Sequence, residues 1–476
     1  MRFDNSYGRL PESFYERIKP EPVEQPGLIL LNHELAESLG LDLPKNEDAL
    51  AALFAGNDLI EGTDPIALAY AGHQFGHFAG PLGDGRAVLL GEVVTEGGER
   101  FDLQLKGSGR TRFSRNGDGR SAIGPVIREY VVSEAMHALG VPTSRALAMV
   151  TTGETVQRET RLPGGVFTRV AASHVRVGTF EYFASQKDEE AVKVLADYVI
   201  DRHYPKARQA KNPYAALFEA ICAAQARLVA KWMCMGFIHG VMNTDNTAIS
   251  GETIDYGPCA FMDNYKPDQV YSSIDHQGRY AYNNQPTIAR WNMACLGGCL
   301  IPLLHEEAEQ AHKIGEDILD RFVEAFKEHY QSGMCSKIGL AYSDENFERM
   351  RDLLALMHKD RVDFTNAFRL LAHEDLDPFK ALFSISNELE EWLATWRSQL
   401  DSPETARQVM LSVNPAFIPR NHRVEQAIQA AEQGDFSLAE KLVEILKRPY
   451  EDQPDHADYM TPPEPDEIVH QTFCGT

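Results

Sequence analysis

Two short segments near the middle of the chain carry side chains suited to a divalent cation. Residues 239–246 read HGVMNTDN, and Asp255-Tyr256-Gly257 follows a short way on. The amide oxygen of Asn246 and the carboxylate of Asp255 are hard oxygen ligands, which Mg²⁺ and Mn²⁺ prefer. Each segment alone is typical of an ordinary loop. Together they predict a site in which Asn246 and Asp255 hold a metal against nucleotide phosphates.

The order of these segments resembles the catalytic and metal-binding loops of protein kinases, in which a loop, a short hairpin and an Asp-aromatic-Gly turn follow one another. Placing His239 and Asn246 on the kinase His and Asn puts Val241 where the catalytic aspartate belongs. Because valine cannot accept a proton, the usual kinase base is missing. Another carboxylate, Asp245, lies beside Asn246 and becomes the candidate base.

A separate basic segment suits a polyphosphate. Between residues 106 and 120 five cations stand against one acid, Asp118. Gly-rich backbone brings N–H groups close to an anion, while the cations neutralise its charge. The alternative is a solvated basic loop, but in a chain with a net charge of −24 this clustering favours an anion site. The residues are Lys106, Arg110, Arg112, Arg115 and Arg120, with Gly107, Gly109, Gly117 and Gly119 between them.

Other residues of the same kind flank this segment. Arg169 and Arg176 follow on later elements, and Gly83 and Gly85 precede a predicted strand. A Gly-x-Gly pair before a strand can fold over phosphates, although by itself it is more often a simple turn. The pair gains weight only from the basic segment that comes after it.

Apolar spacing predicts the elements that position these residues. Residues 86–95 and 100–106 read as a β-hairpin that ends at Lys106. Pro125 opens a helix, which places Glu129 one turn into it. In kinases a strand lysine contacts phosphates and is oriented by a helix glutamate, so Lys106 and Glu129 are candidates for that pair. A surface ion pair is the alternative.

The rest of the chain divides into a β-rich smaller half and a mainly helical larger half, so the fold class is α+β. Strands are predicted near 146–151 and 165–171, and a small hairpin over Asn246–Asp255. Helices are predicted around 31–39 and over 190–203, 213–235, 304–331, 345–357, 378–397 and 421–447. The expected division is 1–60 as an N-terminal extension, 61–172 as the β-rich lobe, 173–449 as the helical lobe with the catalytic and metal loops, and 450–476 as an acidic, Pro-rich tail.

Composition narrows the function classes. The chain has 476 residues, of which 43% are hydrophobic and 24% charged, so it can bury a sizeable core. Its net charge of −24 repels nucleic acids and anionic membranes, and neither is expected as a partner. Seven scattered cysteines without a CxxC pair argue against a disulfide framework and a zinc site. The apolar stretch Trp291–Leu304 is too short and too interrupted to cross a bilayer, and the start lacks a targeting pattern, so we expect a soluble, cytoplasmic protein.

Over nearly its whole length the chain resembles the selenoprotein O (SelO) family, whose bacterial members are the YdiU-type proteins. The resemblance rests on residues 71–87 (AGHQFGHFAGPLGDGRA), 102–130, 239–246 with 255–263, and 275–286. The family has a kinase-like fold and was long regarded as a group of pseudokinases. It transfers AMP from ATP, and in some accounts UMP from UTP, to protein hydroxyls. The resemblance therefore implies a bilobal, protein-kinase-like adenylyltransferase that uses ATP or UTP with Mg²⁺ or Mn²⁺ and modifies exposed Ser, Thr or Tyr hydroxyls of proteins.

The family's functional residues fall on positions of this chain that match in residue type. Its metal ligands fall on Asn246 and Asp255, its proton acceptor on Asp245 and its lysine-orienting glutamate on Glu129. The family binds its nucleotide flipped relative to kinases, which implies an α-phosphate facing the acceptor and an outward-pointing pyrophosphate. Its nucleotide contacts fall on Gly83, Gly85, Arg86, Lys106, Asp118, Gly119, Arg169, Arg176 and Asp255.

The resemblance also draws attention to the tail. Eukaryotic members carry selenocysteine third from the C-terminus, and here that place is Cys474. A tail thiol can form reversible disulfides. Cys259, just after Asp-Tyr-Gly, is the suggested partner, which would make a redox gate on the metal loop. An inert tail thiol is the alternative.

Three functions stay open at this point. The first is a protein adenylyltransferase, the second an ATP-dependent phosphotransferase that recruits Asp245 as its base, and the third a catalytically inactive, nucleotide-binding pseudokinase scaffold. Val241 keeps the last two open, whereas the Asn246 and Asp255 pair weighs against the third. The histidines His73, His77 and His276 are expected to be structural.

Overall fold

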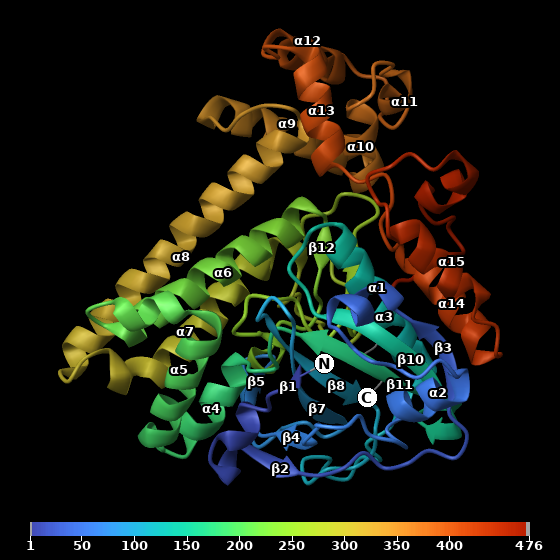
Figure 1. Ribbon diagram of the computed structural model, residues 1–476. Coiled ribbons are helices and arrows are strands. Elements are labelled where there is room, and N and C mark those ends of the chain that lie inside the picture. Colours follow the sequence, from blue (N-terminus) through green and yellow to red (C-terminus); the bar gives the residue numbers. More distant parts are fainter. Residues whose placement is uncertain (1, 473–476) are drawn as a thin grey trace.

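The computed structural model describes residues 2–472. Figure 1 shows an antiparallel sheet built from the N-terminal part of the chain and a larger helical region built from the rest. The protein is therefore α+β, as the sequence predicts, because strands and helices are segregated along the chain and do not alternate.

One nine-stranded sheet forms the β-rich half, in the order β2-β4-β7-β8-β11-β10-β3, with β1 on β7 and β9 on β11. The predicted hairpin corresponds to β7–β8 and is confirmed, and the two strands predicted near 146–151 and 165–171 are β10 and β11, which pair with each other. The strands are β1 (Arg2–Phe3), β2 (Tyr15–Arg17), β3 (Gly27–Leu31), β4 (Ile66–Leu68), β7 (Ala87–Val94), β8 (Arg100–Lys106), β9 (Ser121–Ala122), β10 (Arg145–Gln157) and β11 (Arg161–Ala171). A separate two-stranded hairpin joins β5 (Gly72–Gln74) to β6 (His77–Ala79).

Helices cover both faces of this sheet. On one face α2 (Glu47–Ala55) packs on Leu103, Leu105 and their neighbours, together with α1 (His33–Ser38). On the other face lies α3 (Ile123–Ala138), which begins before Pro125, the residue predicted to open it. Because side chains alternate along β8, Lys106 points to the face opposite Leu105, toward α3. The sheet thus places Lys106 within reach of α3.

The helical half contains more breaks than the sequence predicts. The predicted stretch 378–397 is two helices, and 421–447 is divided at a turn where Gly434 takes a left-handed φ of 89°. The helix α7 (Gln285–Leu304) was not predicted. The others are α4 (Val177–Ser185), α5 (Glu189–His203), α6 (Pro213–Cys234), α8 (Ala308–Lys337), α9 (Asp344–Asp360), α10 (Phe364–Leu371), α11 (Asp377–Lys380), α12 (Asn387–Ser398), α13 (Pro403–Val413), α14 (Asn421–Glu432) and α15 (Ser437–Leu446).

Short elements connect these helices. The predicted hairpin over Asn246–Asp255 is wrong in its pairing: Ala248 bridges to Arg176 and Thr253 to Thr143, so its arms pair with other segments. The two-stranded hairpin at this point is β12 (Phe237–Ile238) with β13 (Ala260–Phe261). The 3-10 turns are η1 (Tyr7–Arg9), η2 (Glu12–Phe14), η3 (Pro205–Gln209), η4 (Thr244–Asn246), η5 (Tyr282–Asn284) and η6 (Pro454–Met460).

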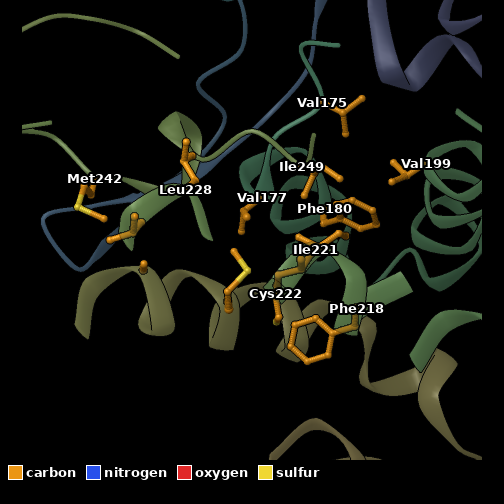
Figure 2. Packing of buried hydrophobic residues seen from close by; sticks show 14 of the residues in the cluster. Val175, Val177, Phe180, Val199, Phe218, Ile221, Cys222, Leu228, Met242 and Ile249 are labelled. Atoms are coloured by element: carbon orange, nitrogen blue, oxygen red, sulfur yellow. The ribbon is translucent and has the colours of Figure 1, made fainter. Parts of the chain in front are cut away.

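A large apolar core fixes the loop that carries the candidate base. Met242 and Ile249 stand on either side of η4 and are both buried in the same cluster as Val177, Phe180 and Ile221. Figure 2 shows these side chains converging from the loop, α4 and α6. Because both ends of the loop are held in the core, the polar residues between them have little freedom to move.

The last two helices of the chain, α14 and α15, pack against the β-rich half. In Figure 1, α14 and α15 return to the β-rich half and lie beside α3, where Arg128 donates to Asn421 at 2.8 Å.

The segment Tyr282–Leu304, which includes α7, is the one helix within residues 2–472 that is long and apolar enough to cross a membrane, with a mean hydropathy of 1.3. It is longer than the stretch predicted, but half of it is buried in the protein, where it packs against α6 and α8 as a core helix.

Candidate active site

A cleft of about 800 Å³ is lined by residues of both halves. Every nucleotide, metal and base residue that the resemblance implies lines it, whereas Arg112, Gly107 and Gly109 of the basic segment do not, and Cys474 lies outside the described residues. The basic segment and the loops of Asn246 and Asp255 therefore share one cleft. The predicted residues that line it are Gly83, Gly85, Arg86, Lys106, Asp118, Gly119, Glu129, Arg169, Arg176, Asp245, Asn246 and Asp255.

Lys106 joins the two halves at the centre of the cleft. Its ammonium group lies 2.6 Å from Oε2 of Glu129 on α3 and 2.7 Å from Oδ1 of Asp255. The candidate pair of Lys106 and Glu129 is thus an ion pair with little exposure to solvent. An Asp from the helical half completes it, so the lysine is oriented from both sides.

Two buried arginines strengthen this arrangement. Arg169 Nη1 lies 2.7 Å from Oδ1 of Asp255 and 3.0 Å from Oε1 of Glu129, and Arg176 Nη1 lies 3.3 Å from Oδ2 of Asp255. Burial alone would raise the pKa of Asp255, but Arg169, Lys106 and Arg176 together hold this pKa well below its usual range. Asp84 also lies 3.9 Å from Arg176, so three cations face three carboxylates, and the surplus of positive charge in the cleft comes from Arg110 and Arg115 of the basic segment.

The donor set at the helical side of the cleft fits a hard divalent cation. The side-chain N–H of Asn246 donates to the carbonyl of Val241 at 3.1 Å, which leaves the amide oxygen as an acceptor. Asp255 adds a carboxylate and holds a φ of 63°, a left-handed conformation that is uncommon for a residue other than Gly. Such strain is typical of functional sites, and oxygen ligands of this kind suit Mg²⁺ or Mn²⁺.

The candidate base Asp245 is held in a different way. Its residue is 8% exposed, and its carboxylate has no ion pair of 4 Å or less within the described chain. Oδ2 accepts a hydrogen bond from Gln74 Nε2 at 3.2 Å, while Oδ1 is buried and has no hydrogen-bond partner among residues 2–472. Burial raises the pKa of this carboxyl to about 6.

The glycines of the two cleft loops are needed because the loops pack on each other. A Cβ on Gly83 would lie 2.3 Å from the ring of Phe113, and one on Gly119, whose φ is 69°, would lie 2.1 Å from the carbonyl oxygen of Gly109. Asp118 binds Arg158 at 2.8 Å and accepts from the backbone N–H of Arg120. The close approach that the sequence suggests for a phosphate therefore occurs first between the loops themselves.

Sequence reasoning missed several residues that line the cleft. Arg158 comes from the β10–β11 turn, and Asp84, buried between the two glycines of PLGDGR, accepts from Gln104 at 3.1 Å. Gln74 belongs to the segment AGHQFGHFAG, which was quoted only for the resemblance. A neutral Gln side chain does not stand out in a sequence as a catalytic residue. Only the structure shows that Gln74 lies beside Asp245.

A second polar cluster lies behind the base. His73 Nδ1 is 2.5 Å from Oε1 of Glu181, whose other oxygen accepts from the hydroxyl of Thr244, and the sulfur of Cys295 lies within 4.8 Å of the His73 and Glu181 ligand atoms. Ligand atoms of one tetrahedral zinc ion stand about 3.3 Å apart, given bonds of about 2.0 Å. The His73–Glu181 separation is that of a direct hydrogen bond, so this cluster is not arranged as a metal centre. We call the hydrogen-bonded set His73, Glu181 and Thr244 the latch, because it ties the β5–β6 hairpin to the loop of Asp245.

Comparisons with known proteins identify the family of the chain. The family model described as protein adenylyltransferase SelO matches residues 1–447. The chain is 58% identical to the protein nucleotidyltransferase YdiU of Maridesulfovibrio salexigens, covering the whole chain and 98% of that protein. It is 56% identical to the YdiU protein of Rhizobium meliloti, covering the whole chain and 99% of that relative, and 54% identical to that of Agrobacterium fabrum, covering the full length of both.

These matches run over the whole chain at high identity. The chain belongs to the protein adenylyltransferase SelO family, and it is an enzyme of the nucleotidyltransferase class.

Proposed function

We propose that this SelO-family enzyme transfers AMP from ATP to Ser, Thr or Tyr hydroxyls of other proteins. UTP is a second donor in this proposal, from which UMP would be transferred. The observation that carries the proposal is the joint position of the Lys106, Arg169 and Arg176 cations and of Asp245 around one cleft. Val241 stands where a kinase has its catalytic aspartate and cannot accept a proton, so Asp245 acts as the general base. The kinase-like bilobal arrangement, with lobes near 61–172 and 173–449, is part of this proposal.

The proposed reaction is an in-line displacement at the α-phosphorus. The acceptor hydroxyl oxygen forms a bond to that phosphorus, the bond to the oxygen bridging to the β-phosphate breaks, and pyrophosphate leaves. Asp245 takes the hydroxyl proton. Lys106, Arg169 and Arg176 hold the phosphates and stabilise negative charge that develops on the leaving oxygen.

Asn246 and Asp255 are the residues that would hold Mg²⁺ or Mn²⁺. When bound, such an ion neutralises phosphate charge and orients the phosphate oxygens. In the structure Asp255 is in contact with three cations, and it would exchange some of these contacts for a metal ion held together with Asn246. Gly83, Gly85, Arg86, Asp118 and Gly119 shape the phosphate-binding wall of the cleft.

The alternative functions differ in which part of ATP is transferred. A phosphotransferase moves the γ-phosphate, whereas a pseudokinase scaffold binds nucleotide without turnover. The acidic composition supports a cytoplasmic protein that modifies other proteins and binds neither nucleic acid nor membrane. A redox role for Cys474 stays a hypothesis, because Cys474 lies outside the described residues.

One labelling experiment separates the three functions. The full chain is incubated with α-labelled or γ-labelled ATP and Mg²⁺ or Mn²⁺, together with a cell extract and with itself as acceptor. We expect protein-bound label from α-labelled ATP only, lost in Asp255→Asn and kept in Asp268→Asn, an exposed acid outside the cleft. Label from γ-labelled ATP would support the kinase, and no label from either would support the scaffold.

A further inference from the structure

The hairpin β5–β6 lies directly on the loop that carries Asp245. The backbone N–H of His73 donates to Oγ1 of Thr244 at 2.6 Å, and Gln74 Nε2 donates to Oδ2 of Asp245 at 3.2 Å. The backbone N–H of Phe75 donates to Oδ1 of Asn243 at 3.2 Å. Three successive residues of the hairpin thus bind three successive residues of the loop.

The turn of this hairpin is strained and firmly held. Phe75 and Gly76 have φ values of 51° and 83°, the left-handed pair of a two-residue hairpin turn, and such a φ is an outlier for a bulky residue. The Phe75 ring packs on Tyr280 at 5.0 Å between centroids, and the hydroxyl of Tyr280 donates to Asn243 at 2.7 Å. Strain that persists in this way needs strong local support, which indicates a functional role.

The latch behind the base fixes the other end of the hairpin. Glu181, whose side chain is only 4% exposed, binds both His73 and Thr244. A Cβ on Gly72 would lie 2.5 Å from Oδ1 of Asp245, so only glycine allows the strand to pass so close to the carboxylate. Oδ1 therefore faces the backbone of the hairpin, and Oδ2 is the oxygen held by Gln74.

A competing partner stands next to the base. Nη1 of Arg176 donates to the backbone oxygen of Asp245 at 3.0 Å, and its Nε is buried without a hydrogen-bond partner among residues 2–472. A carboxylate released from Gln74 has this cation as its nearest attractive partner. An Asp245 side chain that turned toward Arg176 would lose its place beside an acceptor and would also occupy a phosphate-binding cation.

We propose that Gln74 is a positioning residue for the transfer reaction: its amide holds Oδ2 of Asp245 toward the acceptor hydroxyl and away from Arg176. This inference rests on the proposed function, in which Asp245 takes the acceptor proton. The His73–Glu181–Thr244 latch keeps the hairpin in the register that lets Gln74 act. The chain thus orients its base with a neutral side chain and leaves the cations for the phosphates.

The test uses Gln74→Leu and Gln74→Met, which keep a similar shape but remove the donor, with His77→Ala on the exposed side of the same hairpin as control. For both Gln74 variants we expect kcat for AMP transfer to fall about 10- to 100-fold, or ~1.4–2.8 kcal/mol, with KM for ATP within about twofold. The control keeps wild-type kcat. Melting temperatures of all variants identify any that are unfolded. If one Gln74 variant does not fold, the other still provides the test.

A double-mutant cycle excludes a merely structural role. In an Asp245→Asn background, Gln74→Leu should cause little further loss, because the carboxylate it positions is gone. An equal additional loss in that background, a raised KM for ATP with unchanged kcat, or full activity of both Gln74 variants would overturn the inference. Absence of α-label transfer by the wild-type chain would instead refute the proposed function itself.

Discussion

The two walls of the cleft are built on different principles. On the phosphate wall, Lys106, Arg169 and Arg176 converge on Asp255 through charge-assisted contacts of 2.7 to 3.3 Å. On the acceptor wall, Asp245 has no such ion pair among the described residues and is held by an amide, a glycine backbone and a latch. Opposite charges hold Asp255 on the first wall, whereas the Asp245 carboxylate is held by a neutral amide and close packing, with the Glu181 carboxylate binding the residues behind it.

This difference matches what each wall has to bind. A triphosphate is a strong anion, so its wall gains from a surplus of fixed cations that need no rearrangement during the reaction. A base has to accept a proton, and an adjacent cation would favour its charged form and weaken it. The carboxylate of Asp255 forms the ion pairs with the cations, and Arg176 contacts Asp245 through its backbone oxygen, so the cations and the base can work in the same cleft.

The largest expected effect comes from the residue where the charges of the phosphate wall meet. Asp255→Asn removes a charge that three cations share and an oxygen that suits a metal. We expect AMP transfer to fall by about 10³-fold or more, in line with losing a main contributor to transition-state charge stabilisation. Transfer is measured with α-labelled ATP over a range of Mn²⁺ concentrations. Activity recovered fully by added metal would show that Asp255 has a weaker role than the structure suggests.

The next effect compares the stability of the two walls. Arg169 is 1% exposed and binds Glu129, Asp255 and Gln104, so Arg169→Met should lower the free energy of unfolding by about 3–5 kcal/mol. Glu181→Gln on the acceptor wall keeps the shape and part of the hydrogen bonding, and we expect a loss of about 1–2 kcal/mol. Urea denaturation of both variants measures this. Equal losses would contradict the expectation that the Arg169 ion pairs stabilise the fold more than the contacts of Glu181.

Sequence reasoning was much better at the phosphate wall than at the acceptor wall. Lys106 could be placed because a strand pattern ends at it, and Glu129 because a helix begins near Pro125. The cluster of cations at 106–120 stands out against an acidic chain, whereas the roles of Arg169 and Arg176 came from the resemblance to the family.

On the acceptor wall the sequence indicated only the base itself, Asp245, and none of the residues that hold it. Gln74 is neutral, and its role depends on a hairpin that meets a loop far away in the chain. The pairing of Ala248 with Arg176 and of Thr253 with Thr143 was missed for the same reason, since local turn residues suggested that the segment pairs with itself. The breaks inside 378–397 and 421–447 were lost because helical spacing continues in phase across short turns. Long-range pairing decides these features, and periodicity does not encode it.

A smaller effect is expected from the latch. Thr244→Val keeps the shape but removes the hydroxyl that binds His73 and Glu181. We expect kcat to fall about three- to tenfold, with an unfolding cost of about 1–3 kcal/mol for the unsatisfied groups and KM for ATP unchanged. Steady-state kinetics and urea denaturation of the same preparation provide both values. A raised KM for ATP with unchanged kcat would mean that Thr244 acts in nucleotide binding. It would contradict the assignment of Thr244 to the wall that positions the base.

The smallest effect is a difference in salt response. Ions screen charges over about 10 Å at 0.1 M salt and over about 3 Å at 1 M, so binding of ATP to the phosphate wall should weaken as salt is added. We expect KM for ATP to rise a few-fold between low and roughly 0.5 M salt. The ratio of kcat between the wild type and Gln74→Leu should stay constant, because Asp245 and Arg176 are only 8% and 3% exposed and salt screens buried charges much less. Both are read from one series of kinetic measurements with potassium chloride. A kcat ratio that changed strongly with salt would mean that solvent-exposed charges, and not the buried Gln74 hydrogen bond, orient Asp245.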